Sequence, residues 1–140
     1  MRVLALDVGE KRIGVALSDP TGTLASTVGV IERKGLALDV QAVIHLATER
    51  EAEAILLGNP LSLSGEIGPQ ARRILRFSEG LQQVSTLPVL LWDERYSTVD
   101  AGQRLAEAGI RGRRQRQKID ASAAAVFLQE YLDHQKEQRA

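Results

Sequence analysis

Apolar residues recur at two spacings along the chain, and these spacings divide it into predicted strands and helices. Apolar runs of strand length cover residues 2–8, 13–18, 53–57 and 88–92. Residues 23–31 are rich in Thr and Val, which favours a further strand. Helical spacing marks residues 36–50, a segment that begins at Pro69, and residues 120–136. A capping pattern at Ser97 predicts one more helix, ending near Gly109.

This order of elements predicts an α/β fold with a mixed sheet. The first three strands are joined by short connections, so we expect them to form an antiparallel meander. The fourth and fifth strands are separated by helices, which favours parallel pairing through right-handed crossovers. We therefore expect a five-stranded sheet with helices on both faces, in a single domain that spans residues 1–140. Ligands of such sheets bind at the carboxyl ends of the parallel strands.

Composition narrows the classes of function. The chain has no cysteine and only two histidines, which excludes a disulfide framework and a thiol nucleophile and argues against a Ser-His-Asp hydrolase. No apolar run approaches the ~18 residues of a membrane span, and the N-terminus lacks a signal-peptide pattern. We therefore expect a cytoplasmic protein with no membrane partner. Basic and acidic residues balance at 18 each, so any binding of nucleic acid must come from local clusters of charge.

Asp7 is the first candidate for chemistry. It follows four apolar residues in a strand expected at mid-sheet, where a lone carboxylate is costly unless it is paired, hydrogen-bonded or metal-bound. The alternative is an Asp that caps the turn at Gly9. Gly9 also permits close approach to a ligand, and Lys11 and Arg12 follow as cations for a phosphate.

Glu94 and Asp120 are the other candidate acids. Glu94 lies between the fifth strand and a predicted helix, where an acid is also common for reasons of the helix dipole. Spacing does not choose between Asp93 and Glu94, and we prefer Glu94 because Trp92 should share its face of the strand. Asp120 precedes a run of small residues that would let the last helix lie close to the sheet. The alternative is an N-cap role, which Asp strongly favours and which is the preferred interpretation of this residue taken alone. Together with Asp7 these acids would form an oxygen-rich pocket suited to Mg²⁺ or Mn²⁺.

Basic residues gather just before Asp120. The segment 111–118, expected to be a loop, holds five candidate phosphate contacts: Arg111, Arg113, Arg114, Arg116 and Lys118. The alternative is a charged segment that is merely solvated. Asn59, which follows the fourth strand, and Arg95, which follows Glu94, are further candidates for contacts with nucleic acid. Arg72, Arg73 and Arg76 would either widen this basic surface or face water.

Four collinear motifs carry a family resemblance. They are LDVGEKRIGVA at residues 6–16, GNPL at 58–61 with GPQA at 68–71, DER with ST at 93–98, and ID at 119–120 with LQxYL at 128–132. In these motifs the chain resembles the YqgF family, also called RuvX. The resemblance implies a ribonuclease-H-like fold related to the RuvC resolvase, and a cytoplasmic nuclease that depends on a divalent metal. It also implies that Asp7, Glu94 and Asp120 are the catalytic acids.

The sequence and the resemblance together predict a nuclease that hydrolyses phosphodiesters in structured nucleic acid. The family is linked to maturation of the 5′ end of pre-16S rRNA, which suggests a precursor of the small ribosomal subunit as partner. Resolution of Holliday junctions in branched DNA is the alternative, and it would need a two-fold symmetric dimer. No dimer surface is evident, so we expect a monomer or a weak homodimer. A non-catalytic RNA-binding assembly factor and a nucleotide-binding protein are the rival hypotheses.

Overall fold

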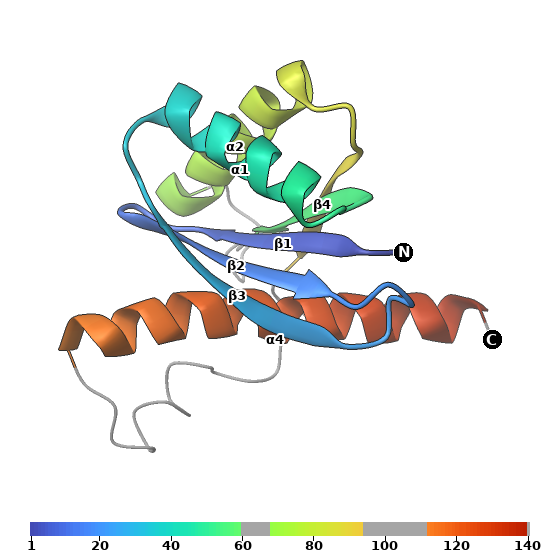
Figure 1. Cartoon of the computed structure of the whole chain (residues 1–140). Helices are drawn as coiled ribbons and strands as arrows, with labels where there is room; N and C mark the ends of the chain where they lie inside the picture. The colour runs from blue at the N-terminus through green and yellow to red at the C-terminus, as the bar shows by residue number, and fades with distance from the viewer. Residues whose placement is uncertain (60–67, 94–111, 140) are drawn as a thin grey trace.

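The computed structural model describes residues 1–59, 68–93 and 112–139, and the side chains of residues 1–58, 68–92 and 123–138 within them (Figure 1). The strands are β1 (Val3–Val8), β2 (Arg12–Ser18), β3 (Ala25–Glu32), β4 (Ala54–Asn59) and β5 (Val89–Asp93). The helices are α1 (Leu36–Glu49), α2 (Pro69–Val84) and α4 (Gly112–Arg139). The helix expected between Ser97 and Gly109 lies outside the described residues.

The strands form one five-stranded mixed sheet in the order β3-β2-β1-β4-β5. β1 pairs antiparallel with β2, and β2 pairs antiparallel with β3. β1 and β4 are parallel, as are β4 and β5. The predicted meander and the predicted parallel pair are therefore both confirmed. β1 lies at the centre, which explains why its sequence is an almost unbroken apolar run.

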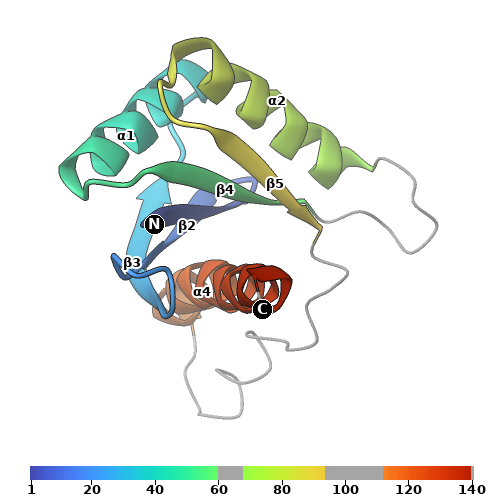
Figure 2. The same ribbon diagram turned by 90° about the vertical axis from the view of Figure 1, so that its right-hand side faces the viewer.

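Helices cover both faces of the sheet (Figure 2). α1 and α2 lie on one face, where Leu4, Leu6 and Val8 of β1 join their core cluster. α4 lies across the other face, where Val3 and Ala5 of β1 contribute to a second cluster. Successive residues of a strand point to opposite faces, so β1 supplies both cores in alternation. None of the helices in the described part of the chain is long and apolar enough to cross a membrane.

The beginning of α4 differs from the sequence prediction. The helix begins at Gly112, so residues 112–118 are helical rather than a loop. The physical reason is that Arg, Gln and Lys, which fill this segment, are among the stronger helix formers. Asp120 consequently lies in the interior of α4, and the N-cap interpretation of this residue is wrong. Among the α4 residues whose side chains are described, Ala124, Phe127, Leu128 and Leu132 are buried.

Candidate active site

Asp7 lies near the carboxyl end of the central strand, on the face that α4 covers. Val3 and Ala5 belong to the core cluster under α4, and Asp7 continues their two-residue alternation. The residue is half-buried, whereas every other residue of β1 is buried. The sheet therefore presents one carboxylate at its centre, beside the apolar surface on which α4 packs.

Glycines lie on both sides of Asp7 in the sheet. Asp7 pairs with Gly14 of β2. On the other side Leu6 pairs with Leu57, so the same register sets Gly58 of β4 level with Asp7. Residues that are level on neighbouring strands share a face, and glycine has no side chain to fill it. No side chain of Gly14 or Gly58 therefore stands beside the Asp7 carboxylate on the two neighbouring strands.

The turn after β1 is closed by the backbone. The N–H of Gly9 donates to the carbonyl of Arg12 at 2.8 Å, so Gly9 does not use this group to bond Asp7. A Cβ on Gly9 would stand 2.9 Å from the Arg12 carbonyl oxygen. Gly9 is therefore required for a close approach of the chain to itself, whereas the sequence suggested an approach to a ligand. Lys11 is exposed in this turn, and Arg12, at the start of β2, is half-buried.

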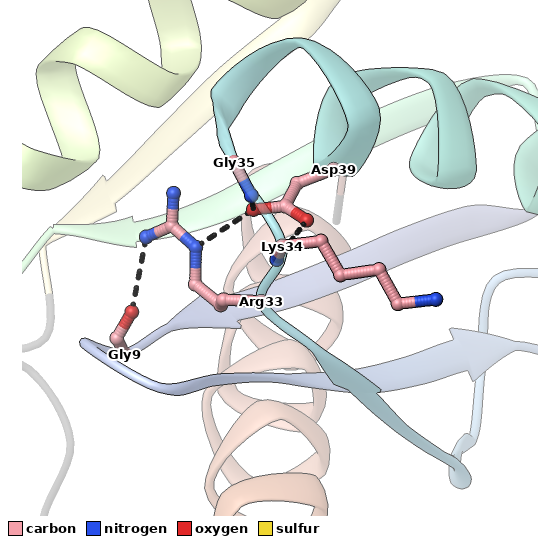
Figure 3. Close-up of polar contacts among 5 residues, drawn as sticks. All are labelled: Gly9, Arg33, Lys34, Gly35 and Asp39. Carbon is pink, nitrogen blue, oxygen red and sulfur yellow. Dashed lines mark hydrogen bonds and ion pairs between the residues drawn. The ribbon is translucent and has the colours of Figure 1, made fainter.

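Two side chains from other elements hold the carboxyl end of β1. The Gln70 side-chain amide, in the first turn of α2, donates to the Val8 carbonyl at 3.0 Å. The Arg33 guanidinium, just after β3, donates to the Gly9 carbonyl at 3.1 Å (Figure 3). Both carbonyls lie within two residues of Asp7, so α2 and the β3–α1 connection fix the backbone that carries the candidate acid.

Asp39 holds Arg33 in place through a buried network (Figure 3). Its carboxylate accepts from Arg33 Nε at 3.0 Å, from the Lys34 N–H at 2.9 Å and from the Gly35 N–H at 3.3 Å. The side chains of Asp39 and Arg33 are 2% and 17% exposed. Burial by itself would raise the pKa of Asp39, but the hydrogen bonds from the backbone and Arg33 outweigh it and hold the pKa below its usual value. No pattern in the sequence signals this network.

α4 is fixed to the edge strand β3 by Gln129. The Gln129 side-chain amide donates to the Thr23 carbonyl at 2.9 Å, and its oxygen accepts from the Ala25 N–H at 2.9 Å. Trp92 of β5 contacts the same helix, with its ring centroid 5.6 Å from that of Tyr131 in an edge-to-face arrangement. These contacts define the position of α4, and hence of the backbone at Asp120, relative to the sheet.

The remaining candidate residues lie at the same end of the molecule or outside the described part. Asn59 ends β4 and is paired in register with Asp93 at the end of β5. The first turns of α4, which include Arg113, Arg114, Arg116, Lys118 and Asp120, lie at the end of the molecule that carries the β1–β2 turn (Figure 1). Glu94, Arg95 and Arg111 lie outside the described residues. Among the residues that are described, no group of three His, Cys, Asp or Glu residues could hold a metal ion.

The arrangement of strands and helices is that of the RuvC-like resolvases, which have the ribonuclease-H-like fold. RuvC of Thermus thermophilus, in complex with a Holliday junction substrate, superposes with a TM-score of 0.61 at 13% identity, over 97% of this chain and 96% of the other. The fowlpox virus Holliday junction resolvase superposes with a TM-score of 0.51 at 14% identity, over 99% of each chain. At these identities the likeness establishes the fold alone.

Sequence relatives define the family. The family model described as "RuvX: Holliday junction resolvase" matches residues 1–134. A Moorella thermoacetica protein named "Putative pre-16S rRNA nuclease" is 46% identical over 95% of this chain and 95% of its own. A protein of the same name from Caldanaerobacter subterraneus is 43% identical over 97% of this chain and 99% of its own. The chain belongs to the RuvX family, as its motifs predicted, and family and fold together support a nuclease.

Proposed function

We propose that the protein is a metal-dependent nuclease that hydrolyses phosphodiester bonds in structured RNA, with the 5′ end of pre-16S rRNA as its substrate. The observation that carries this proposal is the placement of Asp7. A half-buried carboxylate lies at the end of the central strand, level with Gly14 and Gly58 and on the face covered by α4. Such a carboxylate has the exposure and the fixed backbone that a catalytic ligand needs.

Asp7, Glu94 and Asp120 would hold Mg²⁺ or Mn²⁺. An all-carboxylate set of oxygen donors suits these ions, and the half-buried Asp7 fits such a role. When bound, the ions supply an activated water and stabilise the leaving oxygen of an in-line displacement. The interior position of Asp120 in α4 supports its assignment, because Asp is a weak helix former and the capping explanation no longer applies.

Basic residues around this edge would hold the phosphates of the substrate. Lys11 and Arg12 come from the turn next to Asp7, and Asn59 comes from the end of β4. We assign the same role to Arg95 and to Arg111, Arg113, Arg114, Arg116 and Lys118. Because residues 112–118 are helical, positions 113, 116 and 120 are separated by three and four residues, the spacing at which positions lie along one side of a helix. This spacing supports a joint role of basic residues and Asp120 at one substrate strand.

RNA is favoured over branched DNA because relatives that share nearly the full length of this chain are named for pre-16S rRNA. Holliday junction resolution is the second candidate. It is supported by the description of the family model and by the likeness in fold to RuvC. The two candidates use the same acids and differ in the nucleic acid that the basic residues hold.

A cleavage assay on precursor rRNA and on a four-way DNA junction, run side by side with Mg²⁺, Mn²⁺ or EDTA, tests the proposal. We expect cleavage of the RNA with either ion and none with EDTA. Asp7→Asn should slow cleavage by at least about 100-fold, which is roughly 2.7 kcal/mol of lost charge stabilisation. Glu137→Gln, at an exposed carboxylate of α4, is the matched control and should cleave normally.

Three outcomes would contradict the proposal. Cleavage that is equally fast in Asp7→Asn removes the acid from the mechanism. Binding of RNA without cleavage under any metal condition indicates a non-catalytic assembly factor. Cleavage of the junction alone selects the resolvase.

A further inference from the structure

A second polar site lies near the same end of β1 as Asp7, but on the opposite face of the sheet. It is a cavity of about 650 Å³ where the β1–β2 turn meets the beginnings of α1 and α2. Its charged lining consists of four arginines and one glutamate: Arg33, Arg72, Arg73, Arg76 and Glu10. We call this site the arginine cleft. It lies on the α1/α2 side of the sheet, whereas Asp7 faces α4.

The arginines of the cleft differ in what they bond. Arg33 is committed to Asp39 and Gly9, and its guanidinium also lies 5.5 Å from the centroid of the Phe77 ring. Arg73 donates to the side-chain oxygen of Gln70.

Arg72 and Arg76 are exposed, and neither has a carboxylate partner in the part of the chain that the structure describes. The cleft therefore has a fixed wall and two cations available to a ligand. A ligand with several anionic groups would fit this pattern.

The beginning of α2 adds to the positive potential. Pro69 lines the cleft as the first residue of the helix, and Gly68 before it offers no side-chain cap. The first turn of α2 contains no acidic residue, so the positive end of the helix dipole is not compensated there. At α1, by contrast, the Asp39 carboxylate already accepts from the N–H of Gly35. An anion in the cleft would therefore be favoured by α2 as well as by the arginines.

We propose that the arginine cleft binds the phosphodiester backbone of the substrate at a second position, away from the bond that is cleaved. This inference rests on the proposed function, because it assigns the cleft to the same nucleic acid. Gln70 bonds both the Val8 carbonyl and Arg73, so the cleft is connected directly to the end of the strand that carries Asp7. A strand that reaches Asp7 over the carboxyl edge of the sheet would carry flanking phosphates into the cleft.

The arrangement of the cations along α2 favours a chain of phosphates over a free nucleotide as the ligand. Arg72 and Arg76 are four residues apart on α2, which separates their backbones by about 6 Å along the helix axis. Two cations in a row along a helix suit successive phosphates of one chain. No aromatic side chain is among the lining residues in the described part of the protein, so a base would find no stacking surface.

The test compares Arg72→Gln/Arg76→Gln with Arg50→Gln, a control in which an exposed arginine at the far end of α1 is replaced. Binding of fluorescently labelled precursor rRNA is measured by anisotropy over a range of salt concentrations, in both the wild-type and Asp7→Asn backgrounds. We expect the double variant to bind roughly tenfold more weakly near physiological salt and to show a salt slope smaller by about 1.4 to 1.8. Arg50→Gln should match the parent protein.

The outcomes separate this inference from the proposed function. Unchanged affinity and slope in the double variant overturn the cleft assignment, even if the wild type cleaves RNA. A reduced slope supports the cleft, even if no variant cleaves anything. Thermal stabilisation by inorganic tripolyphosphate that the double variant loses, with RNA binding unaffected, would assign the cleft to a free polyphosphate and overturn the proposal.

Discussion

The buried pair of Arg33 and Asp39 allows a quantitative test of how the end of β1 is held. Replacing Asp39 with Ala removes the carboxylate that accepts from Arg33 Nε, the Lys34 N–H and the Gly35 N–H. Arg33 is then left as a cation that is only 17% exposed and has no carboxylate partner at Asp39. Breaking a buried pair from one side costs about 3–5 kcal/mol, which is a large share of the 5–15 kcal/mol that stabilises a typical domain.

Urea denaturation at neutral pH measures this cost. Asp39→Asn keeps the shape and one acceptor oxygen but loses the charge, so we expect a smaller loss of about 1.5–3 kcal/mol. Glu49→Ala is the control, because Glu49 forms an exposed pair with His45 at 3.7 Å and should change the free energy of unfolding by less than about 0.5 kcal/mol. A double-mutant cycle with Arg33→Ala isolates the pair itself, with an expected coupling of about 1–3 kcal/mol.

The contribution of Asp39 to stability should decrease at low pH. The pKa of Asp39 is lower in the folded protein than in the unfolded chain, where it is about 3.9. The contribution of this carboxylate is therefore complete above pH ~4 and is lost as the pH falls through the folded pKa. The difference in stability between wild type and Asp39→Asn should be constant from neutral pH to about pH 5 and shrink below pH 4. If the difference were independent of pH, or Asp39→Ala cost no more than Glu49→Ala, the argument for the network would be refuted.

Two further substitutions test other contacts that position the site. Gly9→Ala places a Cβ 2.9 Å from the carbonyl oxygen of Arg12, so the turn must shift. We expect the free energy of unfolding, measured by urea denaturation, to fall by about 1–3 kcal/mol. An unchanged midpoint would show that the turn can move without cost. Gln129→Leu leaves the Thr23 carbonyl and the Ala25 N–H without their side-chain partner, at a cost of about 1–3 kcal/mol. Faster amide exchange at Ala25 should accompany this loss, and unaltered exchange would contradict it.

Much of the fold could be predicted because the central strands are buried on both faces. β1 and β4 are near-continuous apolar runs, and the short links before β3 permit only a meander. The start of α4 could not be predicted from charge, because a run of Arg, Gln and Lys is compatible with either a solvated loop or a helix.

The candidate site was predictable only as far as single strands carry information. Asp7 could be identified because a carboxylate interrupts an apolar run. The importance of Gly58 could not, because the register between β1 and β4 sets it beside Asp7 and neither strand encodes that register alone. Gln129 was part of a recognised motif, but its partner strand lies more than 100 residues earlier, at Thr23 and Ala25. The roles of Asp7, Glu94 and Asp120 stay predictions.

The balance of charge takes on a different meaning once the residues are placed in the fold. A chain with 18 basic and 18 acidic residues has no bulk attraction for nucleic acid. Any affinity for nucleic acid must therefore arise where cations are concentrated. Two such places lie on opposite sides of one sheet edge: the first turns of α4 and the arginine cleft. A substrate held on only one side could pivot about its contact, whereas contacts on both sides would fix its direction across Asp7. The dependence of binding affinity on salt concentration is proportional to the number of phosphates that the protein contacts. Replacing Arg72 and Arg76 should therefore reduce this dependence by the contribution of the cleft.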